Sequence, residues 1–231
     1  MSKEITNITT PVGRLVGGNP FEPRTEDFDG NPLTIKSGPN AGQPTQQYVV
    51  QIAIPKTDLN FGPLLAEIQK VARNGFPRFF DASGNLLRKD FSWKYIDGDS
   101  TELNKKGNRP CDREGFPGHH ILTFSSAYAP KVYHYGRYTE EIKNPAELRL
   151  GYYIRVAGNC APNNNDNNPG VYLNLNMIEL CGYGPEIVVG LRAEDAFKAP
   201  IQLPTGASAT PVGQQVSGVP AQVPAGVPSN T

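Results

Sequence analysis

Turn-forming residues recur so often along this chain that long helices are excluded over most of its length. Pairs that contain glycine or proline mark turns, and they stand at Gly17-Gly18, Asn31-Pro32, Gly38-Pro39, Asp97-Gly98 and Pro117-Gly118. The segments between the turns are short and rich in β-branched and aromatic residues, which predicts strands. The clearest predicted strands are residues 47–55, 91–96, 120–126, 152–157 and 171–178, with residues 12–16 as a weaker first strand.

One segment, residues 59–73, has the periodicity of an amphipathic helix. Its apolar residues at three- and four-residue spacings are Leu64, Leu65, Ile68 and Val71. Asp58 or Asn60 is expected to cap its N-terminus. A second, shorter helix is predicted at residues 145–148. A strand-rich chain with one amphipathic helix is typical of a barrel or a sandwich that a helix covers.

The charged residues are confined to the first part of the chain. Residues 199–231 contain none and consist mostly of Pro, Gly, Ala, Val, Ser, Thr and Gln, which predicts a flexible, partly extended tail after a folded domain of residues 1–198. The domain therefore carries all 22 basic and all 22 acidic residues. This balance gives no global sign of nucleic-acid or membrane affinity, so any electrostatic binding surface must be local.

The sequence predicts a soluble intracellular protein without a metal or cofactor. The N-terminal segment MSKEITNITTPVG has no apolar stretch, and no run of about 18 apolar residues occurs. Cys111, Cys160 and Cys181 are odd in number and widely spaced, which argues against a disulfide framework. Together with the histidines, they do not form the spacings of a structural zinc site.

The faces of the last two predicted strands suggest a binding surface. Residues 152–157 place Tyr153 and Arg155 opposite Tyr152, Ile154 and Val156, because successive side chains alternate. An aromatic ring beside a guanidinium can stack a base and hold a phosphate. A boundary tyrosine packed by an ordinary surface arginine explains the pattern equally well.

Residues 171–178 repeat this pattern. The side predicted to face the core carries Val171, Leu173, Leu175 and Met177, and the other side carries Tyr172, Asn174, Asn176 and Ile178. Tyr172 is therefore a second candidate for base stacking. In residues 91–96, the rings of Phe91, Trp93 and Tyr95 share one side, which favours a core or covering role over stacking. Trp93 is kept as a secondary candidate for base stacking, together with Tyr133 and Tyr135. Lys94 lies on the opposite side, as a candidate phosphate contact.

Two further segments combine basic and aromatic residues. The loop KKGNRPCDR supplies Lys105, Lys106, Arg109 and Arg113, and the segment after residue 132 supplies Tyr133, Tyr135, Arg137 and Tyr138. A solvated loop is the simplest interpretation of the first segment. A flexible basic loop can also contact a phosphate backbone, and tyrosines interleaved with cations strengthen that interpretation.

Evidence for an enzyme is weak. The sequence contains no GxSxG, GxxxxGK[ST] or HExxH motif. The remaining catalytic alternative is a metal-assisted nuclease that uses Asp97, Asp99 and Glu102, but an acidic turn is usually only a turn.

The order of these segments resembles the bacteriophage single-stranded DNA-binding proteins with an OB fold. The resemblance spans about residues 12–197 and is carried by LVGGNPFEP, QYVVQIAIPKTD, KYIDGDS, GFPGHHILTFSSAYAPKVY, GYYIRVAGNCAPNNNDNNPGVYLNLNMIEL, GYGPEI and AEDAF. It implies a five-stranded Greek-key barrel that coats single-stranded DNA during phage replication, recombination and repair, in the cytoplasm of the infected bacterium. It also implies no catalysis, little sequence preference, and phage or host replication proteins as partners.

The tail departs from that resemblance. Several phage members end in an acidic tail that recruits replication proteins, whereas this sequence ends in GVPSNT with no acid. Two interpretations stay open: the tail is a neutral spacer or contact site, or the sequence stops short of an acidic end. The alternative from another class of protein is a virion structural or decoration protein that uses the barrel as an assembly module.

The run of residues 163–168 is predicted to be a hairpin loop. Asp166 is its sole acid, which argues against a calcium site. Asparagine tolerates left-handed turns, and Pro162 and Pro169 end the flanking strands. In the resembled fold, this loop joins the last two barrel strands.

Overall fold

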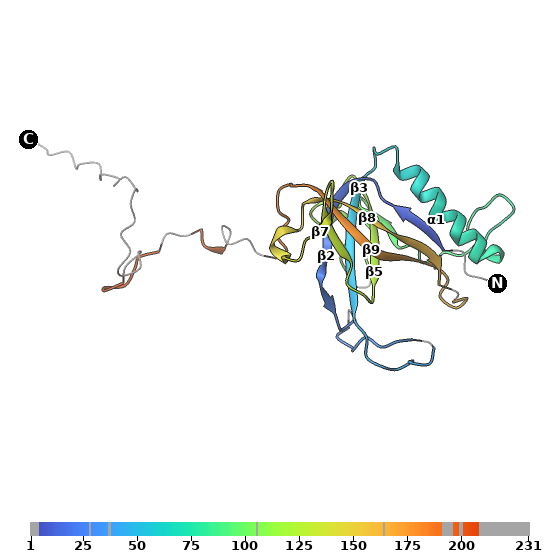
Figure 1. The fold of residues 1–231 in the computed structure, drawn as a ribbon, viewed down its shortest axis with the longest axis horizontal. Helices are drawn as coiled ribbons and strands as arrows, with labels where there is room; N and C mark the ends of the chain where they lie inside the picture. The colour runs from blue at the N-terminus through green and yellow to red at the C-terminus, as the bar shows by residue number, and fades with distance from the viewer. Residues whose placement is uncertain are drawn as a thin grey trace, which may run out of the picture. The chain divides into compact units, whose positions relative to one another are not determined.

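A computed structural model describes residues 5–27, 29–36, 38–104, 106–163, 165–190, 196–198 and 201–207. Within these residues, the strands are β1 (Thr6–Thr9), β2 (Gly13–Arg24), β3 (Gln47–Pro55), β4 (Tyr95–Asp97), β5 (His119–Ser126), β6 (Lys131–His134), β7 (Arg137–Glu141), β8 (Tyr153–Pro162) and β9 (Val171–Gly182). The α-helix is α1 (Phe61–Gly75), and 3-10 helices occur at Pro77–Phe79, Pro110–Asp112 and Pro145–Glu147. Figure 1 shows these elements along the chain.

The strands form the closed barrel that the sequence predicts. β2 pairs with β3 and β3 with β5, both antiparallel, and β5 pairs parallel with β9. β9 then pairs antiparallel with β8, and β8 returns to β2 and closes the barrel. This order is that of the five-stranded OB fold. The remaining strands extend the sheet: β1 pairs with β8, β4 with β5, β6 with β9 and β7 with β6.

The core follows the two periodicities of the sequence. Every second side chain of β3 is buried, beginning at Tyr48 and continuing through Val50 and Ile52. α1 places Leu64, Ile68 and Val71 against the same core and packs on β8 and β1, so it lies beside the barrel in Figure 1. The predicted helix is confirmed, with its start moved to Phe61.

The predicted strand at residues 91–96 is only partly formed. β4 begins at Tyr95, because Lys94 adopts a left-handed backbone conformation with φ of 60°, which interrupts an extended strand. The rings of Phe91 and Trp93 lie 4.6 Å apart, centroid to centroid, and those of Trp93 and Tyr95 lie 6.1 Å apart. All three side chains pack against the barrel core.

For the end of the predicted strand at residues 171–178, the prediction of which side chains face the core is wrong. Ile178 is buried and Met177 is exposed, the reverse of simple alternation. The cause is a β-bulge: Ala157 pairs with Met177 while the next residue, Gly158, pairs with Leu175. Asn176 is thus an extra residue on β9, and one extra residue moves all later side chains to the other face.

Other elements were not predicted or were longer than predicted. β1, β6 and β7 were missed, and β8 and β9 extend to Pro162 and Gly182. The predicted short helix at residues 145–148 is a single 3-10 turn. The compact barrel unit ends at Val188. Residues 199–200 and 208–231 of the predicted tail lie outside the described residues. No helix in the described ranges is long and apolar enough to cross a membrane.

Replacing Gly158 by alanine should destabilise the barrel. A Cβ at this position would lie 1.9 Å from the carbonyl oxygen of Asn174, so the bulge would have to open. We expect the free energy of unfolding to fall by about 2–3 kcal/mol, the upper part of the usual range, in urea denaturation. Gly182→Ala is the control, since nothing lies within 4 Å of its Cβ. Equal stability of the two variants would contradict this account of the bulge.

Candidate nucleic-acid interface

The predicted site residues do not share one surface. Lys94 and Arg113 lie beside the outer side of β3 and β5, and Tyr172 lies on the outer side of β9, next to the segment that carries Lys94. Tyr153, Arg155 and Tyr133 lie on the outer side of β8, β9 and β6. The others are dispersed: Trp93 packs on the core, Lys106 and Arg109 are in the β4–β5 connection, Tyr135 and Arg137 are at the β6–β7 turn, and Lys105 lies outside the described residues.

The first of these surfaces, the β3–β5 face, consists of the outward side chains Gln47, Val49, Gln51, Thr123 and Ser125. Gln51 Nε2 donates a hydrogen bond to Thr123 Oγ1 at 3.2 Å, and Arg113 Nη2 donates to Gln51 Oε1 at 3.2 Å. A Cβ at the neighbouring Gly17 would lie 2.5 Å from Gln51 Oε1. Because Gly17 has no side chain, the Gln51 side chain can occupy the space above it.

A second, smaller core covers the other end of this outer surface. Its buried members are Val16, Ala53, Phe116, Ile121 and Ile187. The Arg113 guanidinium lies 4.0 Å from the centroid of the Phe116 ring. Arg113 thus stands at the boundary between the covered apolar end and the open polar end.

Three cations surround the polar end of the β3–β5 face. The pKa of Lys94 is lowered, first by partial loss of solvent around its ammonium and then by the positive charge of Arg24. Burial also lowers the pKa of Arg113 and of Arg24, with Asp27 partly offsetting the effect at Arg24. In the described part of the chain, neither Lys94 nor Arg113 forms a salt bridge. Lys94 and Arg113 therefore bring positive charge to this face that no salt bridge among the described residues neutralises.

Tyrosines lie at two edges of this face. The segment from Ser92 to Lys94 runs between β5 and β9: Thr123 N–H donates to Lys94 O at 2.8 Å, and Val171 N–H donates to Ser92 O at 3.0 Å. Because Ser92 bonds to Val171, the segment that carries Lys94 runs next to the residue before Tyr172, whose side chain is 47% exposed. Tyr128, 82% exposed, follows the end of β5.

The second surface, the β8–β9 face, has a neutralised centre. Its outward side chains are Arg155, Ala157, Asn159, Asn174, Met177 and Glu179. Arg155 Nε donates to Glu179 Oε2 at 2.6 Å, and Tyr138 OH donates to Glu179 Oε1 at 2.6 Å. Burial raises the pKa of Glu179, but hydrogen bonds from Arg155, Tyr138 and Cys181 together lower it below its usual value of 4.5. The charge of Arg155 is thus paired within the protein.

The β8–β9 hairpin separates the two predicted base stackers. Tyr153 pairs with Gly182 at one end of the hairpin, and Tyr172 pairs with Ala161 at the other. At about 3.3 Å per residue, the two tyrosines are about 25 Å apart along the strand. A hollow of about 400 Å³ beside Arg155 is lined by Tyr133, Tyr138 and Met177, among others. Its lining on β8 is Arg155 and Ala157, and it includes neither of the two predicted stackers.

The acidic turn of the nuclease alternative contacts a lysine. Lys56 Nζ lies 2.5 Å from Asp97 Oδ1 and 2.8 Å from Asp99 Oδ2. Hydrogen bonds from Lys56 are the first cause that lowers the pKa of each carboxyl. The two carboxylates therefore hold an ammonium group between them. Among the residues that the structure describes, no cluster of three His, Cys, Asp or Glu side chains could hold a metal ion.

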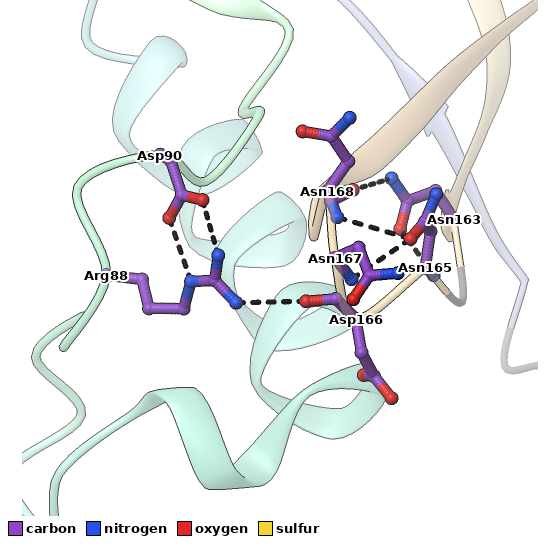
Figure 2. A network of polar contacts seen from close by, with 7 residues as sticks. All are labelled: Arg88, Asp90, Asn163, Asn165, Asp166, Asn167 and Asn168. Carbon is purple, nitrogen blue, oxygen red and sulfur yellow. Dashed lines mark hydrogen bonds and ion pairs between the residues drawn. The ribbon is translucent and has the colours of Figure 1, made fainter.

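The predicted hairpin loop does join β8 and β9, and side-chain hydrogen bonds shape it. Asn163 Nδ2 donates to Asn168 O at 2.7 Å, and Asn165 Oδ1 accepts from the backbone N–H of Asn167 at 3.0 Å and of Asn168 at 3.2 Å. Figure 2 shows this network and the guanidinium of Arg88, whose Nη1 donates to Asp166 O at 2.9 Å. The asparagines thus fix the loop backbone.

Several residues of these surfaces were missed by sequence reasoning. They are Arg24, Gln51 and Tyr128 on or beside the β3–β5 face, and Glu179 on the β8–β9 face. Gln51 was detectable, because it stands on the polar side of the predicted strand QYVVQIAIP. Glu179 was not, because its face depends on the bulge at Asn176.

Glu179→Gln should change the pH dependence of stability. Because the folded-state pKa of Glu179 is lowered, its ionisation contributes stability above its unfolded pKa, and this contribution is lost as pH falls through the folded pKa. The variant should lose about 1–3 kcal/mol of unfolding free energy at pH 7, the range for hydrogen bonds to charged groups. It should also lose less stability than the parent as pH falls below about 4.5. Urea denaturation at several pH values measures both.

Glu186→Gln is the matched control for this experiment, because Glu186 forms an exposed ion pair with Arg149. Acid dependence that is the same in the parent and in the Glu179→Gln variant would contradict the pairing of Glu179.

Comparison with known proteins identifies relatives of this chain. Residues 33–205 match the family model described as "Enterobacter phage Enc34, ssDNA-binding protein". The fold is similar to the solved structure of the single-stranded DNA-binding protein from bacteriophage Enc34 in complex with ssDNA, with a TM-score of 0.55 and 16% identity over 79% of this chain and 89% of that chain. A second structure of the Enc34 protein gives a TM-score of 0.54 and 17% identity over 83% and 89%. The search of curated proteins found no match.

Proposed function

Because the chain belongs to the family of the Enterobacter phage Enc34 ssDNA-binding protein, we propose that it binds single-stranded DNA along the β3–β5 face. The protein would coat exposed strands during phage replication, recombination and repair, in the cytoplasm of the infected host. Its contribution would be binding without catalysis. Phage or host replication proteins are proposed as further partners.

The observation that carries this proposal is the positive charge on the β3–β5 face. Lys94 and Arg113 stand beside a polar sheet surface without a salt bridge within the described ranges, and the charge of Arg24 acts on Lys94. Partly desolvated cations gain most from a ligand that brings its own negative charge. In OB folds, this part of the barrel and the adjoining loops bind oligonucleotides.

The side chains of the face suit an extended strand. Lys94, Arg113 and Arg24 would contact successive phosphates, since cations along the phosphate backbone dominate affinity. Gln51 and Thr123 would supply hydrogen bonds. Tyr172 would stack a base, and we add Tyr128 at the end of β5. Contacts of these types read the backbone and the ring faces, which explains binding without sequence preference.

Removing the two cations should weaken binding and reduce its salt dependence. We expect Lys94→Gln with Arg113→Gln to lower affinity for oligo-dT and to reduce the slope of log affinity against log salt by about 1.4, or about 0.7 per phosphate contact on a single strand. Fluorescence titrations with single- and double-stranded oligonucleotides across a salt range measure this.

Lys70→Gln, on the exposed side of α1, is the control and should leave the slope unchanged. Parent protein that binds no oligonucleotide in a salt-sensitive way would contradict the function and favour the virion alternative. Binding by the double variant that equals the parent would instead contradict the location.

Tyrosine substitutions test which end of the hairpin stacks bases. Stacking contributes about 1–3 kcal/mol per base, so Tyr172→Ala should weaken oligo-dT binding by about that amount, while Tyr172→Phe should bind like the parent. The sequence prediction that Tyr153 and Arg155 contact DNA is tested in the same titration by a Tyr153→Ala, Arg155→Ala double variant. A larger loss in that variant than in Tyr172→Ala would place the strand on the β8–β9 face.

A further inference from the structure

An aspartate of the β8–β9 loop contacts two arginines that are not part of the proposed DNA interface. Asp166 Oδ2 forms an ion pair with Arg78 Nη2, and both side chains are 61% exposed. The backbone carbonyl of the same residue accepts a hydrogen bond from Arg88 Nη1. Two guanidinium groups therefore converge on one loop residue, whose carboxylate is the only acid in residues 163–168.

The two arginines are held in place without Asp166. Arg78 and Arg88 lie over the Phe79 ring, with their guanidinium carbons 4.9 Å and 5.0 Å from its centroid. Asp90 accepts hydrogen bonds from Nε of Arg88, at 2.8 Å, and from its Nη2. Figure 2 shows that this pairing leaves the Nη1 side of Arg88 directed at the loop. The arrangement presents preorganised donors that suit an oxyanion.

The loop keeps its shape without the Asp166 carboxylate. Its backbone is fixed by Asn163 and Asn165, through hydrogen bonds to the segment that ends at Asn168. In Figure 2, the carboxylate of Asp166 points away from these asparagines. The side chain therefore acts on the arginines and not on the fold of the loop.

This pair of arginines borders the end of the interface that carries Tyr172. Ser92 N–H donates to Pro169 O at 2.9 Å, which joins the end of the loop to the segment that leads to Lys94. A strand that lies over Lys94 and Tyr172 can thus continue past the loop toward Arg88 and Arg78. Alternation between exposed cations and aromatic rings is the pattern of single-strand binding surfaces.

We propose that Arg78 and Arg88 form a phosphate-binding subsite for single-stranded DNA, and that the Asp166 carboxylate occupies it in the free protein as a substitute for a phosphate. The inference rests on the proposed function. When a strand binds, a backbone phosphate takes the place of the carboxylate on Arg78, and Asp166 turns to solvent. The loop aspartate thereby lowers the affinity for single-stranded DNA, because the phosphate has to displace it from Arg78.

Matched charge variants test the subsite. Asp166→Asn and Glu186→Gln each remove the acid from an exposed ion pair with an arginine. The partner of Glu186 is Arg149, which precedes the start of β8, whereas the loop of Asp166 follows the end of that strand. At 0.1 M salt, Asp166→Asn should bind oligo-dT about fivefold more tightly than Glu186→Gln. One phosphate contact on a single strand changes log affinity by about 0.7 for each tenfold change in salt, so it contributes about fivefold at 0.1 M relative to 1 M. Equal affinities of the two variants would overturn the proposal.

The arginine variants provide a second readout that does not depend on the loop. Arg78→Gln should reduce the salt slope of the parent by about 0.7, and Arg149→Gln should leave it unchanged. Combining Arg78→Gln with Asp166→Asn should abolish the gain in affinity. An unchanged slope in Arg78→Gln would overturn the subsite, whereas a parent without oligo-dT binding would refute the proposed function itself.

Discussion

The pairing of β8 with three other strands determines the rest of this structure. β8 pairs with β9 along most of its length, with β2 at its start, and with β1 at residues 157–160. The contact with β2 closes the barrel, so the outer surface is divided among strands that face different directions. Aromatic and basic side chains that look equivalent in the sequence consequently lie on different faces. The interface that we propose uses only those on or beside the β3–β5 face.

Charge distinguishes the two faces. On the β8–β9 face, Arg155 is paired with the largely buried Glu179, and removing a carboxylate from such a pair leaves a cation without compensation. On the β3–β5 face, Lys94 and Arg113 bond to no acid within the described ranges, and their lowered pKa values reflect burial. The charge of Arg155 is balanced without a ligand, whereas the charges of Lys94 and Arg113 would be balanced by the phosphates of a bound strand. This difference, more than the number of cations, is the reason to place DNA on the β3–β5 face.

The fold was largely predictable, because it depends on patterns local to each strand. Alternation identified β3, β5 and most of β8, and the spacing of Leu64, Ile68 and Val71 identified α1. The site was less predictable, because it depends on register between strands. A bulge at Asn176 exchanges the faces of Met177 and Ile178, and the left-handed Lys94 shortens β4. Neither an asparagine nor a lysine marks such a position in a single sequence.

The polar run between Pro162 and Pro169 combines two roles that composition does not separate. Asn163 and Asn165 bond to the backbone of Asn167 and Asn168 with their side chains, which gives the described part of the loop a defined shape without burying apolar surface. That order places the carboxylate of Asp166 on Arg78. A disordered loop with the same composition would carry the same charge but would not direct it at one guanidinium. Both side chains of this ion pair are exposed to solvent, so a phosphate of a bound strand can reach the guanidinium that the aspartate contacts.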